Sequence, residues 1–254
     1  MNKFLSIMAM LLLLSCTACS QETDLAEKIR LAEQGDVDAQ FILGTRYQDG
    51  KGVAHSQVEA VKWFRLAAEQ GDAIAQFYLG VMHENGDGVP KNDAEAMKWY
   101  RLAAEQGDAS AQFNLGVMYD NGESLLKNNT EALKWFRLAA EQGYDRAQFN
   151  LWNMYHNGRG VAQSDAEALK WLRLAAEQGL VGAQFNLGVM YKNGDGIPEN
   201  YARAYLWFSM AAAQGYEGAS ENRDEASALL DVETRNTAQQ LATRCFDSGF
   251  KDCE

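Results

Sequence analysis

Apolar side chains recur along the chain at the spacing of amphipathic helices. Ala75, Leu79 and Met82 stand at positions i, i+4 and i+7, which places all three on one face of a helix. This stripe predicts a helix over about residues 72–84, and a second helix is predicted over about residues 93–106. Residues 85–89 between them read Asn-Gly-Asp-Gly-Val, and the two glycines are typical of a turn.

The same two-helix pattern returns at a fixed interval of 36 residues. Its tryptophans are Trp63, Trp99, Trp135, Trp171 and Trp207. The glycines of its Glu-Gln-Gly tripeptide are Gly35, Gly71, Gly107, Gly143 and Gly179. Self-similarity at a fixed period of roughly 20–50 residues is typical of a solenoid, in which each repeat packs on its neighbours. The pattern therefore predicts an all-α solenoid.

Capping residues mark the ends of the second helix in each repeat. The residues before its start are Ser56, Asn92, Asn128, Ser164 and Asn200. Such side chains accept hydrogen bonds from free helix N–H groups. In the first four repeats a glutamate follows three residues later and predicts a capping box, whereas Arg203 takes this place in the fifth. Gly71 and its equivalents are expected to cap the other end.

These motifs resemble the Sel1-like repeat family, which is related to tetratricopeptide repeats. The resemblance rests on A-x-x-x-L-G, the N-G-x-G-V loop, E-A-x-K-W and A-A-E-Q-G, and it covers about Gly35 to Gly215. It implies a right-handed α-solenoid of antiparallel helix pairs, whose first helices line a concave groove. It also implies that Gly80 and its equivalents let neighbouring helices approach closely, while the tryptophans fill the space between the two helices.

The two ends of the solenoid are expected to differ from its repeats. Residues 23–215 are predicted to hold five repeats behind an N-terminal capping helix, and residues 216–254 a degenerate repeat and a C-terminal capping helix. Such caps are needed because a terminal repeat would otherwise expose its apolar face. Cys245 and Cys253 are expected to form a disulfide. The alternative of a metal or redox pair lacks C-x-x-C spacing and nearby histidines.

The first residues read as an export signal. Lys3 precedes an apolar run from Phe4 to Leu14, which is too short to span a bilayer, so residues 1–18 are assigned to a signal peptide. Small residues before two cysteines resemble the lipobox of bacterial lipoproteins, with Cys16 expected to be lipidated and Cys19 as the alternative. The resemblance implies a periplasmic protein anchored to the outer membrane, which contacts the membrane only through this lipid.

The charge and the inventory of reactive residues narrow the function further. The chain has 35 acidic and 23 basic residues and a net charge of −12, which argues against binding to nucleic acid. His55, His83 and His156 have no metal-ligand spacing, and no nucleophile has a visible base partner. We therefore expect no catalytic residue, no metal and no cofactor. An enzyme that binds or cleaves β-lactams is an alternative suggested by cysteine-rich relatives, whose cysteine pairs this chain lacks.

Some positions of the first helix vary between repeats while their neighbours stay constant. Three such sets lie at offsets of 0, 4 and 7 and share one helix face, which in this family points into the groove. The predicted partner-binding residues on this face and beside it are Ile74, Tyr78, Val81, Ser110, Asn114, Val117, Arg146, Asn150, Trp152 and Asn153. The alternative is that these positions are merely exposed and unconstrained.

Trp152 departs most from the repeat. It replaces the glycine found at positions 44, 80, 116 and 188. An indole at a close-packing position either projects outward, where it would be a plausible hot spot, or belongs to a repacked core. The sequence leaves both alternatives open.

Taken together, the residues predict a binding protein. The expected function is an exported scaffold that holds a partner protein in its groove. The resemblance implies one version in particular, an immunity protein that neutralises a secreted antibacterial toxin such as a lipase. A second version is an adaptor for enzymes that build the cell wall or envelope.

Overall fold

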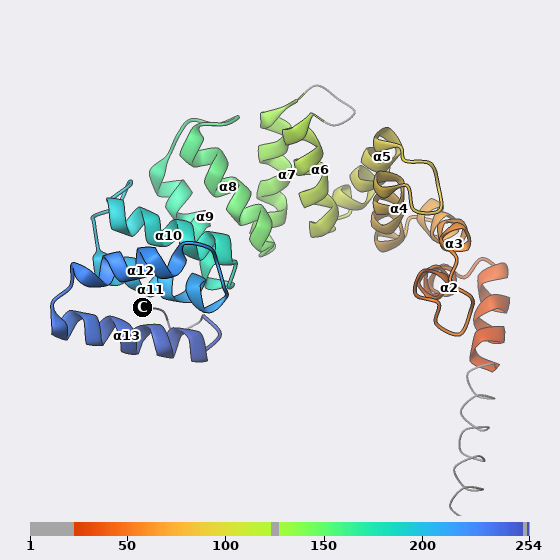
Figure 1. The fold of residues 1–254 in the computed structure, drawn as a ribbon. Helices are drawn as coiled ribbons and strands as arrows, with labels where there is room; N and C mark the ends of the chain where they lie inside the picture. The colour runs from red at the N-terminus through yellow and green to blue at the C-terminus, as the bar shows by residue number, and fades with distance from the viewer. Residues whose placement is uncertain (1–22, 123–126, 251–252, 254) are drawn as a thin grey trace, which may run out of the picture. The chain divides into compact units, whose positions relative to one another are not determined.

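The computed structural model describes residues 23–122, 127–250 and 253 of the 254-residue chain, and Figure 1 shows it as a ribbon. Both candidate lipidation sites, Cys16 and Cys19, lie outside the described residues, as does the assigned signal peptide. Within the described residues all regular structure is helical and no strand occurs. The expected all-α solenoid of antiparallel helix pairs is confirmed.

Residues 23–33 are helical and precede the first helix pair. The pairs are α2 (Val37–Asp49) with α3 (Gln57–Glu69), α4 (Ala73–Asn85) with α5 (Asp93–Glu105), α6 (Ala109–Asn121) with α7 (Asn129–Glu141), α8 (Asp145–Asn157) with α9 (Asp165–Glu177), and α10 (Val181–Asn193) with α11 (Tyr201–Ala213). We call the first helix of each pair helix A and the second helix B. The chain ends with α12 (Ala219–Ala228) and α13 (Val232–Asp247).

The chain divides into two compact units. The N-terminal unit extends to Ala111, and the C-terminal unit begins at Gln112, so the boundary falls within α6.

The predicted N-caps of the B helices are confirmed. The side chain of Asn92, for example, accepts hydrogen bonds from the backbone N–H groups of Ala94 and Glu95, each at 3.1 Å. The fifth cap also forms, since Asn200 accepts from the backbone N–H of Arg203 at 2.9 Å.

The second half of the predicted capping box is wrong. The backbone N–H of Asn92 donates to the carbonyl of His83 at the end of helix A, at 2.8 Å, so it is not free to bond Glu95. Glu95 instead pairs with Lys98 one turn further on, at 3.5 Å. The backbone N–H that a capping box would use is therefore bonded to the antiparallel partner helix.

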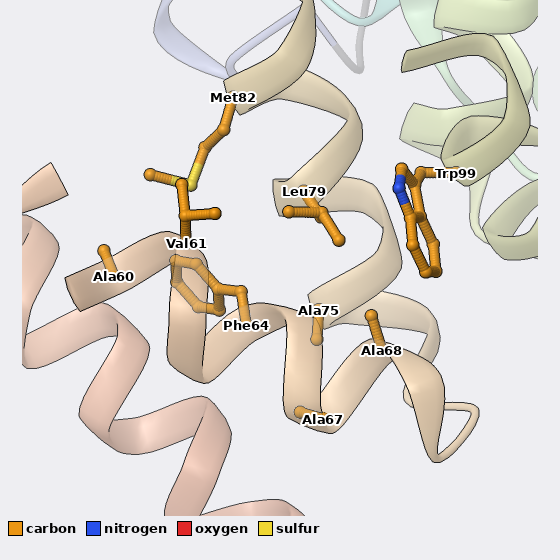
Figure 2. Packing of buried hydrophobic residues seen from close by; sticks show 9 residues of the cluster. All are labelled: Ala60, Val61, Phe64, Ala67, Ala68, Ala75, Leu79, Met82 and Trp99. Atoms are coloured by element: carbon orange, nitrogen blue, oxygen red, sulfur yellow. The ribbon is translucent and has the colours of Figure 1, made fainter. Parts of the chain in front are cut away.

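The core of each pair depends on a small residue in helix A and a large ring in helix B. A Cβ atom on Gly80 would lie 2.6 Å from the ring of Tyr100, so only glycine permits this approach. Trp99 of α5 lies against Leu79 of α4 and Ala68 of α3, as Figure 2 shows. The close approach at glycine and the filling role of tryptophan are both as the resemblance implied.

The C-terminal helices cover a face that the earlier B helices leave exposed. Where α9 carries Lys170 and Leu174, α11 carries Leu206 and Met210, which are only 1% and 2% exposed. Both α12 and α13 pack on α11. The change from polar to apolar side chains therefore marks the end of the repeat array, where α12 and α13 both cover α11.

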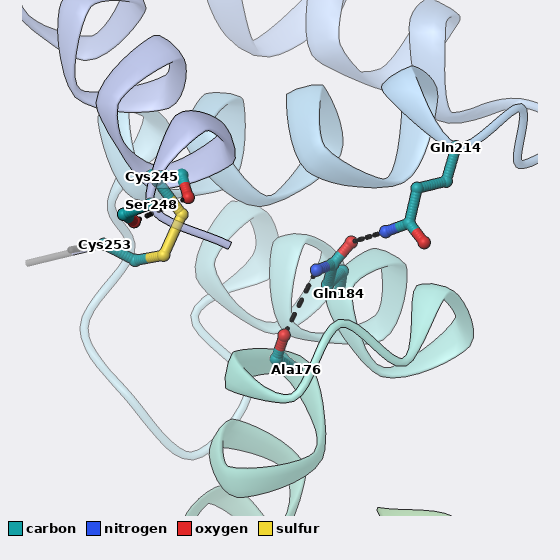
Figure 3. Close-up of a disulfide and its surroundings, with 6 residues drawn as sticks. All are labelled: Ala176, Gln184, Gln214, Cys245, Ser248 and Cys253. Atoms are coloured by element: carbon teal, nitrogen blue, oxygen red, sulfur yellow. Dashed lines mark hydrogen bonds between the residues drawn. A yellow bond between two sulfur atoms is a disulfide. The ribbon is translucent and has the colours of Figure 1, made fainter. Parts of the chain in front are cut away.

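The end of the chain is joined back to α13. Cys245 and Cys253 form a disulfide, shown in Figure 3, and the hydroxyl of Ser248 donates to the carbonyl of Cys245 at 2.9 Å. The preceding helix α12 begins at Ala219, directly after Gly218, which adopts a left-handed conformation with φ of 75°.

Candidate partner-binding surface

A buried glutamine network sets the position of each helix A, and the sequence analysis missed it. Gln184 of α10 donates to the carbonyl of Ala176 in the preceding helix B at 3.1 Å and accepts from Gln214 at 2.7 Å (Figure 3). The same two bonds are made by Gln40, Gln76 and Gln148. These glutamines keep the 36-residue interval, which is the signal that could have revealed them.

The network has a consequence for the surface. A buried amide with both of its polar atoms bonded costs little, whereas an unpaired one is expensive, so the arrangement strongly favours one register of helix A. Each helix A therefore presents the same positions outward. We call the surface formed by the three varying sets of positions the A-helix face. The sets are Asp38, Ile74, Ser110, Arg146 and Gly182; Ile42, Tyr78, Asn114, Asn150 and Asn186; and Thr45, Val81, Val117, Asn153 and Val189.

In the N-terminal unit the A-helix face is apolar on α4, whereas α2 contributes the exposed Asp38 and the polar Thr45. Ile74 is 50% exposed, and Val81 on the same helix is partly exposed. Tyr78 between them stacks on Phe64 with ring centroids 5.2 Å apart, and it also contacts Phe41 at 5.9 Å. Of these three predicted residues, Tyr78 is thus held in the packing between repeats, and Ile74 is the most accessible.

A cavity of about 550 Å³ lies at the start of the same unit. Ile42 and Thr45 of the A-helix face line it together with two ion pairs, Arg46 with Asp24 and Lys51 with Asp49. The two cations and two anions balance, so the cavity has no net charge to attract an ionic ligand. The sequence analysis did not predict it.

In the C-terminal unit the A-helix face is polar. Asn114, Asn150 and Asn153 are partly exposed, Arg146 is exposed, and Val117 is an apolar exception. Ser110, which precedes this group on α6, belongs to the N-terminal unit and is also partly exposed. The predicted residues are therefore accessible to different degrees, with Trp152 as the outlier.

Of the two alternatives for Trp152, the repacked core is the one that the structure shows, so its place among the partner-binding residues is wrong. Its side chain is only 9% exposed, and its ring lies 4.9 Å from that of Phe149 and 5.8 Å from that of His156. Elsewhere in the C-terminal unit the equivalent position is glycine facing a phenylalanine ring, as in Gly188 with Phe208. In this repeat the ring position holds Leu172. Compared with the other repeats, this repeat has the large side chain, Trp152, on helix A and the smaller one, Leu172, on helix B. Trp152 therefore belongs to the core.

The histidines show no arrangement suited to catalysis or metal binding. His83 is 7% exposed, stands where other repeats have tyrosine, and neither ring nitrogen has a hydrogen-bond partner in the described structure. Burial, with Arg65 nearby, lowers the pKa of His83. Among residues 23–122, 127–250 and 253, no group of three or more His, Cys, Asp or Glu side chains could hold a metal ion. No helix in that same part of the chain has the length and apolar character needed to cross a bilayer.

These features define a class of protein, a helical-repeat scaffold with a constant core and a variable outer face. Within that class, the chain belongs to the Sel1 repeat family. The family model matches residues 37–72, 73–108, 109–144, 145–180 and 181–216. Proteins of this family are typically interaction scaffolds and not enzymes.

Solved structures agree with this assignment. A Sel1 repeat protein from Oxalobacter formigenes is 33% identical with a TM-score of 0.70, over 89% of this chain and 96% of that one. The Escherichia coli protein c5321, a protective antigen of uropathogenic strains with an SLR fold, is 31% identical with a TM-score of 0.59, over 90% of this chain and 57% of that one.

A more distant match shares only the fold. It is the immunity protein Pa5087 of Pseudomonas aeruginosa, 20% identical with a TM-score of 0.45, over 82% of this chain and 81% of that one. No match was found among curated proteins.

Proposed function

We propose that this protein is an exported scaffold that binds a partner protein through its A-helix face. One observation carries the proposal: the core of the repeats and the glutamine network stay constant while the outward positions of helix A change from repeat to repeat. A constant frame with varied contact residues is how solenoids build extended recognition surfaces. The mechanism is recognition without turnover.

The particular partner we propose is a secreted antibacterial toxin, such as a lipase, which the protein would neutralise as an immunity protein. The export signal supports this version, because a toxin that enters the cell envelope would meet its inhibitor there. An adaptor for an envelope-building enzyme is the second version. The two differ in outcome: an immunity protein abolishes its partner's activity, whereas an adaptor leaves it intact.

We further propose that the mature protein is anchored to the outer membrane in the periplasm through Cys16, or through Cys19. Mass spectrometry of the membrane-extracted protein would identify the acylated cysteine. Cys16→Ala should abolish acylation if Cys16 is the site, and Cys19→Ala should abolish it in the alternative case. Acylation that persists in the double variant would overturn the anchor.

The binding proposal is tested by recovering the partner from a periplasmic extract with tagged mature protein and then measuring affinity for the purified partner. Ile74→Asp places a charge on the A-helix face, and Leu102→Asp places one on the exposed face of helix B, where Leu102 is 38% exposed. The first substitution should weaken binding by about tenfold or more, and the second should leave it unchanged. Equal effects, or recovery of no protein, would refute the proposal.

A further inference from the structure

One position of the A-helix face carries the same polar side chain three times in succession. Asn114, Asn150 and Asn186 occupy it in α6, α8 and α10, all within the C-terminal unit. In the N-terminal unit the same position holds Ile42 and Tyr78. The run of identical amides is therefore a property of the C-terminal unit and not of the repeat itself.

The helices that carry these asparagines are neighbours in matching register. Phe113 of α6 stacks on Tyr144, just before α8, with ring centroids 5.0 Å apart. Phe149 of α8 lies 3.9 Å from the position of a Cβ atom on Gly182 in α10. Each asparagine directly follows one of these phenylalanines or its equivalent, so the three amides form a row across the A-helix face.

Two of the three side-chain amides make no hydrogen bond within the described part of the chain. Asn114 and Asn150 are half-buried, and neither side chain makes a hydrogen bond within the described residues. Asn186 differs, because its Nδ2 donates to the carbonyl of Gly182 at 2.7 Å. Asn153, one turn beyond Asn150 on α8, adds a further partly exposed amide.

An asparagine amide has both a donor and an acceptor, as a peptide group has. It can therefore bond the N–H and the C=O of another main chain at once. A helical partner has already bonded most of its main-chain groups internally, whereas an extended segment has them free. Arg146 is the only charged residue among the ten predicted partner-binding residues, and Val117 and Val189 flank the row, so charge does not dominate this part of the surface.

A glycan would also offer hydrogen-bonding groups, but the exposed aromatic faces that usually stack on sugar rings are engaged here. Phe113 is stacked on Tyr144, and Phe185 on Tyr216 with centroids 4.7 Å apart. An extended peptide needs no such stacking.

We propose that the asparagine row, Asn114 and Asn150 with Asn186 beside them, binds an extended segment of the partner protein through its main chain. This inference rests on the proposed scaffold function and names the part of the partner that is recognised. The row favours partner segments that have an extended backbone and no bulky side chain facing α6 and α8. The charge of the segment has little effect on binding.

The experiment uses a random dodecapeptide display library as the probe, panned on the mature protein. Enriched peptides should bind the double variant Asn114→Ala/Asn150→Ala about 10- to 100-fold more weakly, the loss expected from several main-chain hydrogen bonds. Backbone N-methylation of an enriched peptide should weaken binding similarly, and raising the salt concentration should not. Asn157→Ala is the matched control, because that amide is exposed on the same helix and already donates to the carbonyl of Asn153 at 2.8 Å.

Three results would overturn the asparagine row: no enrichment, equal binding to the double variant, or equal binding of the N-methylated peptide. The variant Asn114→Leu/Asn150→Leu keeps the side-chain size and should lose binding while its thermal unfolding stays close to wild type. If the recovered protein partner binds wild type and both double variants equally, the row is refuted while the scaffold function stands. If no protein partner is recovered, the scaffold function itself fails.

Discussion

The two units start their A helices in different ways. In the N-terminal unit the start is capped by aspartate: Asp36 and Asp72 accept hydrogen bonds from the backbone N–H groups of Ala39 and Ala75, at 2.8 and 2.6 Å. In the C-terminal unit α8 follows Tyr144 and α10 follows Leu180, and neither side chain caps its helix. Tyr144 stacks on Phe113 of the preceding helix A instead.

The difference shows that one turn can be stabilised in two ways. An aspartate cap satisfies a free N–H group of its own helix and acts within one repeat. An aromatic stack buries apolar surface against the neighbouring repeat and so links two repeats. On the A-helix face the units differ in the opposite way: Tyr78 of the N-terminal unit packs between repeats, whereas the side chain of Asn150 in the C-terminal unit makes no hydrogen bond within the described residues.

The largest difference in stability between the units is expected where a glycine of helix A faces an aromatic ring of helix B. Leu172→Phe in the C-terminal unit restores the common ring opposite Trp152, where two large side chains do not fit. We expect a loss of about 3 kcal/mol in the free energy of unfolding, measured by urea denaturation. Gly80→Trp in the N-terminal unit should cost at least as much, because the Cβ atom alone would lie 2.6 Å from Tyr100.

The matched control for this prediction is a double substitution. Gly188→Trp with Phe208→Leu recreates the natural combination of Trp152 and Leu172 and should recover most of the stability lost by Gly188→Trp alone. If the single and double variants are equally unstable, the exchange of sizes is not what accommodates Trp152.

The glutamine network should be equally important in both units. Gln184→Leu removes two hydrogen bonds, the one that Gln184 donates to the buried carbonyl of Ala176 and the one that it accepts from the exposed Gln214, and we expect a loss of about 2 kcal/mol. Gln76→Leu, which breaks the same contacts in the N-terminal unit, should cost the same. Urea denaturation followed by circular dichroism measures both. Unequal losses would mean that the units differ in their cores as well as at their surfaces.

Substitutions at the helix starts should differ in their effect between the two units. Asp72→Ala removes a cap and should lower the free energy of unfolding by about 1 kcal/mol. Tyr144→Asp gains a cap and loses a stack, so the two effects should offset to within about 1 kcal/mol. Thermal unfolding of both variants tests this, and a neutral Asp72→Ala would contradict the assigned role of the cap.

The smallest effect concerns His83 in the N-terminal unit. Its pKa is lowered by burial and by Arg65 on α3, with Glu95 on α5 opposing and Lys98 on α5 adding to the shift. The unfolded state therefore binds a proton more readily, and stability should fall as the pH drops below about 6.5. His83→Tyr, the residue of the other repeats, should remove this part of the loss between pH 8 and 5, whereas His55→Gln should not. An identical pH profile for wild type and His83→Tyr would refute the effect.

Much of the fold was predictable from the sequence because its signals are repeated. The N-caps, the close approach at Gly80 and the position of Trp99 all follow from residues that recur at one interval. The capping box was predicted only in part. Its second hydrogen bond does not form because the backbone N–H of the N-cap residue donates to a carbonyl of helix A, which the local sequence does not specify. The glutamine network was overlooked because a glutamine in a helix usually indicates an exposed residue.

The candidate site was less predictable. The varying positions of helix A identified which residues face outward, and most of the ten are at least partly exposed. They did not reveal that Tyr78 stacks on Phe64 or that Trp152 turns inward, because both depend on the space left by residues of other helices.

The sequence alone determined the repeat, the helix pairs, their caps and the Sel1 family, because these depend on local chemistry and on a period that can be counted. Only the tertiary structure decided which polar groups are satisfied. It showed that the buried glutamines are bonded across helices, whereas the side chains of Asn114 and Asn150 make no hydrogen bond within residues 23–122, 127–250 and 253. A hydrogen bond between helices depends on the distance between atoms that are far apart in the chain, and no local pattern specifies that distance.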